Sequence, residues 1–229
     1  GLVGSEMCIR DRSAVEHSSI MESAKKLEDN GFDVVYIMPR EDGTIHKEDV
    51  LEKVDENTIL VSVMCVNNET GAIMNVTDIF SAVKAKNSDV ICHTDAVQAF
   101  GKISLSASRL HADLISVSGH KIHAPKGVGA IFVKKGVRLV PLHYGGEQEK
   151  KLRPGTEAIP LIAAMGVACG EFNIDKNYDY VSKLNSYAKD KLLKIDGVSL
   201  NSPENALPYV LNISCLLYTS PSPRDPKTS

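Results

Sequence analysis

Short apolar runs alternate with amphipathic stretches through the middle of this chain, and this alternation constrains the fold more than any other feature. The amphipathic stretches are typical of helices, because their apolar residues recur on one face. Strands that alternate with helices in this way build mostly parallel sheets. We therefore predict an α/β fold, a mostly parallel sheet with flanking helices. The predicted strands are 34–37, 59–64, 90–94, 113–117 and 130–134, and the predicted helices are 20–27, 47–54 and 76–86.

The spacing of the later elements indicates where the main sheet ends. The connection between the last two predicted strands, residues 118–129, is short, so we expect these strands to pair antiparallel. Residues 159–194 are then largely helical, with an interruption at 173–177. The apolar runs at 198–200 and 209–213 begin a second layer, which stops before it can close.

Four segments follow from this pattern. Residues 14–158 form a large domain that is incomplete on its N-terminal side, and residues 159–214 form a linking helix and the start of a truncated C-terminal α+β domain. Residues 1–13 show neither helical nor strand periodicity, and residues 215–229 are rich in Pro and Ser. Both ends resemble translated sequencing-adapter read-through, so we expect an internal fragment with non-native ends; the alternative is a pair of ordinary floppy termini.

Composition narrows the class of protein. Hydrophobic residues make up 43% of the 229 residues and charged residues 24%, which is typical of a packed domain. A net charge of −3 with interspersed signs does not favour nucleic-acid binding. The longest apolar stretch, 158–169, contains Pro160 and is shorter than the roughly 20 residues that span a bilayer. The five cysteines include no CxxC pair, which favours a reducing compartment. We expect a cytoplasmic protein that contacts neither nucleic acid nor membrane directly.

Polar residues gather where predicted strands end. Asn68 follows the second strand, Asp95 closes the third, and Ser118 to Lys121 follow the fourth. In open α/β sheets, ligands bind in the crevice at the carboxyl ends of the strands. This convergence predicts one binding site built from several strand ends.

The residue types at these positions point to a particular chemistry. An amine and a carboxylate at neighbouring strand ends are what a pyridoxal phosphate (PLP) enzyme needs. Lys121 would form a Schiff base, and Asp95 would hold the pyridine nitrogen protonated. Gln98, one helical turn from Asp95, could reach the phenolic oxygen, while Ser118 and His120 offer donors to the phosphate. The alternative for Lys121 is a solvated lysine beside a turn.

Several motifs, in this order, resemble the cysteine desulfurases, relatives of the class V aminotransferases among fold-type I PLP enzymes. The resemblance covers about residues 14–214 and implies the fold of the PLP-binding large domain of that class. The motifs are Glu16-His17, Val66-Asn67-Asn68-Glu69-Thr70-Gly71, His93-Thr94-Asp95-Ala96-Val97-Gln98, Ser118-Gly119-His120-Lys121 followed by Pro125-Lys126-Gly127, and Arg153-Pro154-Gly155-Thr156-Glu157.

The resemblance implies a role for each matching residue. Lys121 is the PLP lysine, and Asp95 pairs with the pyridinium. His17 stacks on the ring face and shuttles protons. Thr156 reaches the phosphate of the partner subunit's cofactor, which implies a homodimer with shared sites. The remaining cofactor contacts are Asn68 and Gln98 near the ring oxygen, and Ser118 and His120 on the phosphate.

The reaction implied by the family removes sulfur from L-cysteine and leaves L-alanine and a persulfide on an enzyme cysteine. An acceptor or scaffold protein then takes the sulfur for iron–sulfur cluster assembly or tRNA thiolation. The family's glycine-rich phosphate loop is absent here, and its nucleophilic cysteine and substrate-binding arginine are expected beyond position 214. Glu147 replaces a usual glycine. We interpret Cys65, Cys92 and Cys169 as structural.

Other readings stay open. A selenocysteine lyase or another class V PLP enzyme would share the same cofactor framework. The chain could also be a catalytically inactive fragment. His120 and His123 lie three residues apart, but carboxylates or thiols would have to converge with them, so no metal site is expected.

Overall fold

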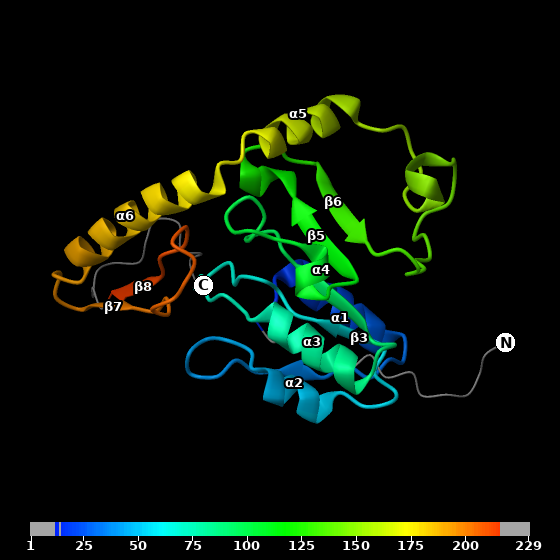
Figure 1. Ribbon diagram of the computed structural model, residues 1–229, viewed down its shortest axis with the longest axis horizontal. Coiled ribbons are helices and arrows are strands. Elements are labelled where there is room, and N and C mark those ends of the chain that lie inside the picture. The colour runs from blue at the N-terminus through cyan, green and yellow to red at the C-terminus, as the bar shows by residue number, and fades with distance from the viewer. Residues whose placement is uncertain (1–11, 14, 216–229) are drawn as a thin grey trace, which may run out of the picture.

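A six-stranded sheet forms the centre of the structure, a computed structural model that describes residues 12–13 and 15–215 (Figure 1). The strand order is β2-β1-β3-β4-β5-β6, and every neighbouring pair is parallel except β5 and β6. This arrangement confirms both the mostly parallel sheet and the antiparallel last pair. The strands are β1 (Arg12–Ser13), β2 (Tyr36–Ile37), β3 (Leu60–Ser62), β4 (Ile91–Asp95), β5 (Leu114–Ser118) and β6 (Gly129–Val133).

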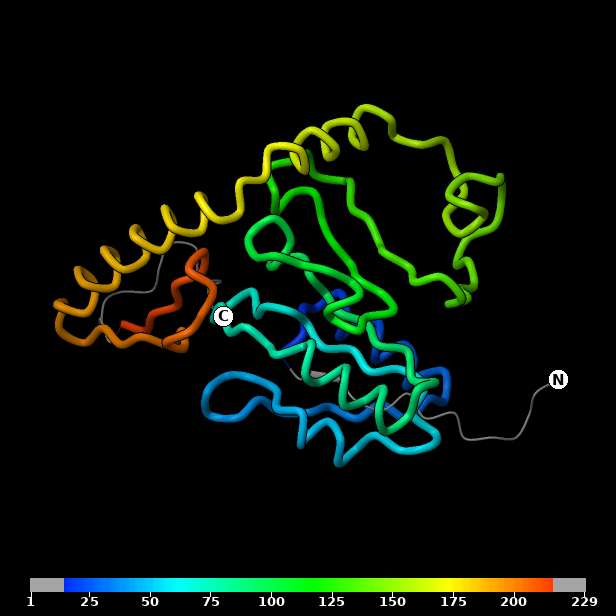
Figure 2. Tube along the Cα trace, in the orientation of Figure 1, coloured from blue at the N-terminus to red at the C-terminus, as the bar shows by residue number. Residues whose placement is uncertain are grey.

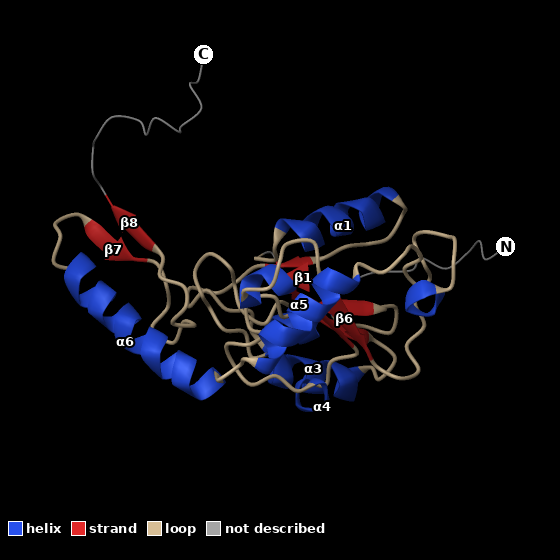
Figure 3. Ribbon diagram, turned by 90° about the horizontal axis from the view of Figure 1, so that it is seen from above, coloured by secondary structure: helices blue, strands red, loops and turns tan. Residues whose placement is uncertain are grey.

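Helices cover both faces of this sheet. Seen from above, α1 lies on one side of the strands and α3 with α4 on the other (Figure 3). Asn75 starts α3, because its side chain accepts a hydrogen bond from the backbone N–H of Asp78 at 3.3 Å. The same helix buries Ile79, Phe80 and Val83 against the sheet. The helices of this part are α1 (Ser18–Asp29), α2 (Lys47–Lys53), α3 (Val76–Lys86) and α4 (Ala107–Leu110).

The later chain forms a second, smaller layer beside the sheet (Figures 1 and 3). It contains α6 and the antiparallel pair β7 and β8. The predicted break between the two long helices is shorter than expected, because Asn173 already caps α6 through a bond from the N–H of Lys176. The elements are the single turns η1 (Gly119–Ile122) and η2 (Gln148–Lys151), α5 (Ile159–Gly170), α6 (Ile174–Leu192), β7 (Val198–Leu200) and β8 (Ile213–Cys215).

The chain between β7 and β8 returns to the main sheet, as the tube in Figure 2 shows. Leu207 is fully buried, and its N–H donates to the carbonyl of Gly71 at 2.8 Å. Gly71 has φ of 78°, and a Cβ there would lie 3.0 Å from the Cβ of Val210. The second layer is therefore fastened to the loop that follows β3.

The structure contains two elements that were not predicted, β1 and α4, and one predicted strand lies elsewhere. Arg12–Ser13 form β1, although no strand was expected before position 14; backbone pairing with β2 and β3 needs no apolar pattern in two residues. The strand predicted at 209–213 forms instead at Ile213–Cys215, because the preceding residues pack on the Gly71 loop. The helix α4 was not predicted. Residues 1–11, with Cys8, residue 14 and residues 216–229 lie outside the described part, so the expectation of non-native ends remains untested there.

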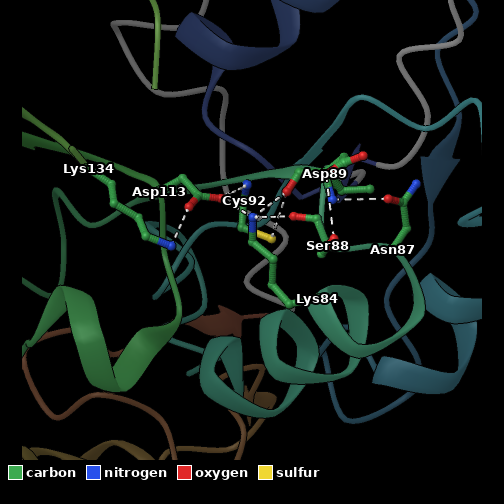
Figure 4. A network of polar contacts seen from close by, with 8 residues as sticks. Lys84, Asn87, Ser88, Asp89, Cys92, Asp113 and Lys134 are labelled. Carbon is green, nitrogen blue, oxygen red and sulfur yellow. Dashed lines mark hydrogen bonds and ion pairs between the residues drawn. The ribbon is translucent and has the colours of Figure 1, made fainter. Parts of the chain in front are cut away.

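A buried carboxylate, Asp113, ties the sheet to α3 at the amino ends of β4 and β5, whereas the predicted site residues follow their carboxyl ends. Figure 4 shows the polar contacts around it. Asp113 accepts the N–H of Cys92 at 2.9 Å and pairs with Lys84 at 2.5 Å and Lys134 at 3.0 Å. Burial alone would raise the pKa of Asp113, but these hydrogen bonds hold the pKa below its ordinary value.

Within the residues that the structure describes, no helix is both long and apolar enough to cross a bilayer.

Candidate active site

A cavity of about 380 Å³ opens at the carboxyl ends of β3, β4 and β5. It brings together all the predicted site residues except Thr156. They come from separate segments of the chain, which meet because neighbouring parallel strands end at the same edge. The lining residues are His17, Ser19, Met64, Asn68, Asp95, Val97, Gln98, Ser118, His120 and Lys121.

Asp95 lines this cavity at the end of β4. Its side chain is 7% exposed, and Oδ1 accepts the N–H of Val97 at 2.9 Å. Burial raises the pKa of Asp95, while the Val97 N–H and the nearby His17 ring oppose the rise. Oδ2 has no hydrogen-bond partner within residues 15–215. A buried carboxylate in this state is stabilised by a cationic N–H donor.

Lys121 enters the cavity from η1, the turn that follows β5. Gly119 allows this turn to lie close to the next strand, because a Cβ there would be 2.9 Å from Cγ1 of Val128. The turn ends at His123, which is left-handed with φ of 67°. Lys121 makes no hydrogen bond or ion pair with any other described residue. The amine is therefore available to a ligand.

His17 borders the cavity as the N-cap of α1. Its Nδ1 accepts the N–H of Ser19 at 3.2 Å and lies 2.9 Å from the Ser19 hydroxyl. The residue before His17, Glu16, is held in place because its buried Oε1 accepts a hydrogen bond from the N–H of Met64 at 2.6 Å. These bonds leave Nε2 as the imidazole nitrogen that can serve the cavity.

Asn67 organises the loop that carries Asn68. Its Oδ1 accepts the N–H groups of Glu69 at 2.9 Å and Thr70 at 2.8 Å, and its Nδ2 donates to the carbonyl of Val15 at 3.0 Å. The side chain thus joins the loop after β3 to the segment before α1. The sequence motif contained Asn67, but its positioning role becomes visible only when both segments are seen together.

The two residues that were predicted to bind the phosphate of PLP, Ser118 and His120, also lie together. Ser118 Oγ and His120 Nδ1 are 2.7 Å apart, so the two side chains present a hydroxyl and an imidazole at one end of the cavity. Thr156 is different: it is exposed, precedes α5 and does not line this cavity. Its predicted contact involves a second copy of the chain and stays a prediction.

Sequence reasoning missed Lys102, a half-buried lysine that contacts the cavity residue Gln98. Its Nζ donates to Oε1 of Gln98 at 3.0 Å and lies 5.5 Å from the ring centroid of Tyr209. Gln98 and Lys102 are four residues apart in a run of tight turns after β4. That spacing places side chains on one side of a helical turn, so it was the signal available.

The fold and this cavity define a class of protein. Residues 10–220 match the family described as aminotransferase class-V, and the chain belongs to that family. The predicted family and the predicted fold are both confirmed.

The curated relatives that the chain matches include cysteine desulfurases. The chain is 36% identical over 206 residues to cysteine desulfurase IscS of Buchnera aphidicola subsp. Baizongia pistaciae. The matched region covers 88% of this chain and 50% of that relative. It is 38% identical over 205 residues to putative cysteine desulfurase IscS 1 of Bacillus subtilis, with 87% and 53% covered. The chain thus spans about half the length of the curated relatives it matches.

Solved structures of similar sequence also share this fold. A structure titled NifS-like protein superposes with a TM-score of 0.85 at 38% identity, over 91% of this chain and 58% of that one. A structure titled SspA in complex with cysteine gives 0.80 at 34% identity, with 91% and 58% covered.

Proposed function

We propose that this chain is the cofactor-binding part of a PLP-dependent cysteine desulfurase. The observation that carries the proposal is the meeting of Lys121 and Asp95 on the wall of one cavity, in a chain whose relatives are described as cysteine desulfurases. The reaction converts L-cysteine to L-alanine and leaves the sulfur as a persulfide on an enzyme cysteine.

The groups on the cavity wall fit PLP. Asp95 offers a buried acceptor, Lys121 an unpaired amine, and Ser118 with His120 polar hydrogens. Such a set complements a pyridinium N–H, an aldehyde and a phosphate. When bound, PLP supplies an electron-accepting ring that stabilises negative charge on the substrate Cα.

Each protein group has a distinct task in this proposal. Asp95 keeps the ring nitrogen protonated by accepting its N–H. Lys121 supplies the amine for the aldehyde and holds or releases a proton at Nζ. His17 would stack on the ring and move protons through Nε2. The groups that would bind the oxygens are Asn68 and Gln98 near the phenolic oxygen, and Ser118 and His120 at the phosphate, with Thr156 serving the cofactor of a partner subunit.

The persulfide-forming cysteine is proposed to lie in another part of the longer protein. Cys65 and Cys92 are buried, and burial raises the pKa of Cys65 to about 11 and that of Cys92 to about 12. A thiol in that state is a poor nucleophile, because the thiolate is the reactive form. The other two cysteines of the described residues, Cys169 and Cys215, do not line the cavity. We therefore propose that the 229-residue chain alone has no turnover.

The cellular part of the proposal follows the family resemblance. We propose a cytoplasmic homodimer that passes sulfur to an acceptor or scaffold protein, for iron–sulfur cluster assembly or tRNA thiolation.

Two experiments test the function. PLP added to the chain should produce a visible absorption band that Lys121→Ala abolishes and Lys126→Ala, a nearby exposed control, retains. A protein that contains this segment at the full length of its relatives should release alanine and sulfide from L-cysteine. Activity on selenocysteine alone would replace the desulfurase assignment with a selenocysteine lyase. Cysteine turnover by the 229-residue chain would contradict the assigned absence of the nucleophile.

A further inference from the structure

Lys102 does not line the cavity that holds Asp95 and Lys121, but it contacts Gln98, which does. The Nζ of Lys102 donates to Oε1 of Gln98 at 3.0 Å, and its charge also faces the ring of Tyr209, 5.5 Å away. Burial lowers the pKa of Lys102, and the positive charge of Lys121 lowers it further. A partly buried cation near a second amine is costly, so the contact with the Gln98 oxygen needs an explanation.

The chemistry of the two side chains fixes which end of the amide faces Lys102. An ammonium group only donates hydrogen bonds, so it can bind the amide oxygen but not the amide nitrogen. The NH2 group of Gln98 is then the end left for the cavity that Gln98 lines. Gln98 is 9% exposed, and its NH2 group has no acceptor elsewhere in the described chain.

We propose that Lys102 is a positioning residue, which orients the Gln98 amide so that its NH2 group donates to the phenolic oxygen of PLP. The inference rests on the proposed function, and it adds a residue that does not itself touch the cofactor. The two ends of a primary amide are nearly equal in size, so packing alone selects weakly between them. A reversed amide would place its carbonyl oxygen against the negative phenolic oxygen, and that arrangement is repulsive.

The test uses the pH dependence of the visible band of PLP bound to the 229-residue chain. A donor to the phenolic oxygen stabilises its negative charge and so favours the deprotonated form of the bound chromophore. Lys102→Met should therefore raise the pH midpoint of the band by about one unit, the size of one hydrogen bond. Lys102→Arg keeps a donor and a charge and should restore most of the original midpoint. Lys135→Met removes an exposed lysine charge and should leave the midpoint unchanged.

A double-mutant cycle separates positioning from simple loss of charge. If Lys102 acts through Gln98, Lys102→Met should shift the midpoint little in a Gln98→Ala background. A full-size shift in that background would overturn the inference, because it would mean that the Lys102 charge acts directly.

Gln98→Glu gives a second measurement that leaves Lys102 intact. The carboxylate keeps the contact with Lys102 but replaces the NH2 donor with an oxygen, so the midpoint should rise in the same direction. An unchanged midpoint contradicts the assigned donor. Absence of any band in the unsubstituted chain contradicts the proposed function, and the inference with it. A normal band without a Lys102 effect contradicts the inference alone.

Discussion

Replacing Asp113 by alanine should remove a large part of the folding free energy, because this carboxylate joins α3, β4, β5 and the residue after β6 (Figure 4). The side chain of Asp113 is 4% exposed. Lys84, 20% exposed, also donates to the carbonyl of Val90 at 2.6 Å, so its ammonium group is held where the carboxylate neutralises it.

The two ion pairs of Asp113 differ in their expected contribution. Lys134 is 54% exposed, and solvent-exposed ion pairs are worth about 0.2–1 kcal/mol. Removing one partner of a buried pair costs about 3–5 kcal/mol, because the other charge stays buried. We therefore expect Asp113→Ala to cost about 3–5 kcal/mol, Lys84→Met about 2–4 kcal/mol and Lys134→Met less than about 1 kcal/mol.

Urea unfolding followed by far-ultraviolet circular dichroism measures these costs at pH 7. Lys135→Met, an exposed lysine next to Lys134, is the matched control and should stay within about 0.5 kcal/mol of the original chain. Equal costs for Lys84→Met and Lys134→Met would refute the argument from burial, and so would an Asp113→Ala cost below about 1 kcal/mol.

The same network predicts a pH dependence. The pKa of Asp113 is lowered in the folded chain, despite the opposing effect of burial. Its stabilising contribution is therefore present above the ordinary carboxyl pKa of about 3.9, and it is lost as the pH falls through the folded value. The stability difference between the original chain and Asp113→Asn should be constant near pH 7 and should shrink below about pH 4.

Three further outcomes concern the candidate site. Asp95→Asn should stabilise the cofactor-free chain at neutral pH and raise the midpoint of its thermal unfolding. Burial raises the pKa of Asp95, so the ionised side chain destabilises the fold once the pH is above the ordinary carboxyl pKa. Gly119→Ala should cost about 1–3 kcal/mol in urea unfolding and weaken the PLP band, because the new Cβ would meet Val128. Asn67→Ala should cost about 1–3 kcal/mol, since the N–H groups of Glu69 and Thr70 lose their acceptor; amide exchange would be fastest there.

Local sequence pattern predicted element types well and element ends poorly. The helix at 76–86 was predicted with the observed bounds, because an Asn cap and an apolar face mark both its start and its period. The two-residue β1 carries no such pattern and owes its place to backbone pairing with β2 and β3. The shift of the last strand has a similar cause, since Leu207 is drawn onto the Gly71 loop by a contact distant in sequence.

Contacts between distant segments also explain what was missed around the site. Asp113 pairs with Lys84 and Lys134, which lie 29 and 21 residues away in the sequence, and no periodicity links the three. Asn67 binds the carbonyl of Val15, which lies 52 residues earlier in the sequence. Such pairs depend on register and helix placement, which a single sequence does not specify.

The cavity itself was accessible from the sequence for a geometric reason. In the register of β4 and β5, Asp95 lies opposite Ser116, so β5 continues two residues further, to Ser118, before it turns. A chain that turns at this point within a four-residue helical turn brings Lys121 back over the end of β4. Placing a lysine three residues after the end of one strand and an aspartate at the end of its neighbour is therefore enough to bring both to one cavity. The contact between Lys102 and Gln98 was not predicted, although their spacing of four residues was visible in the sequence.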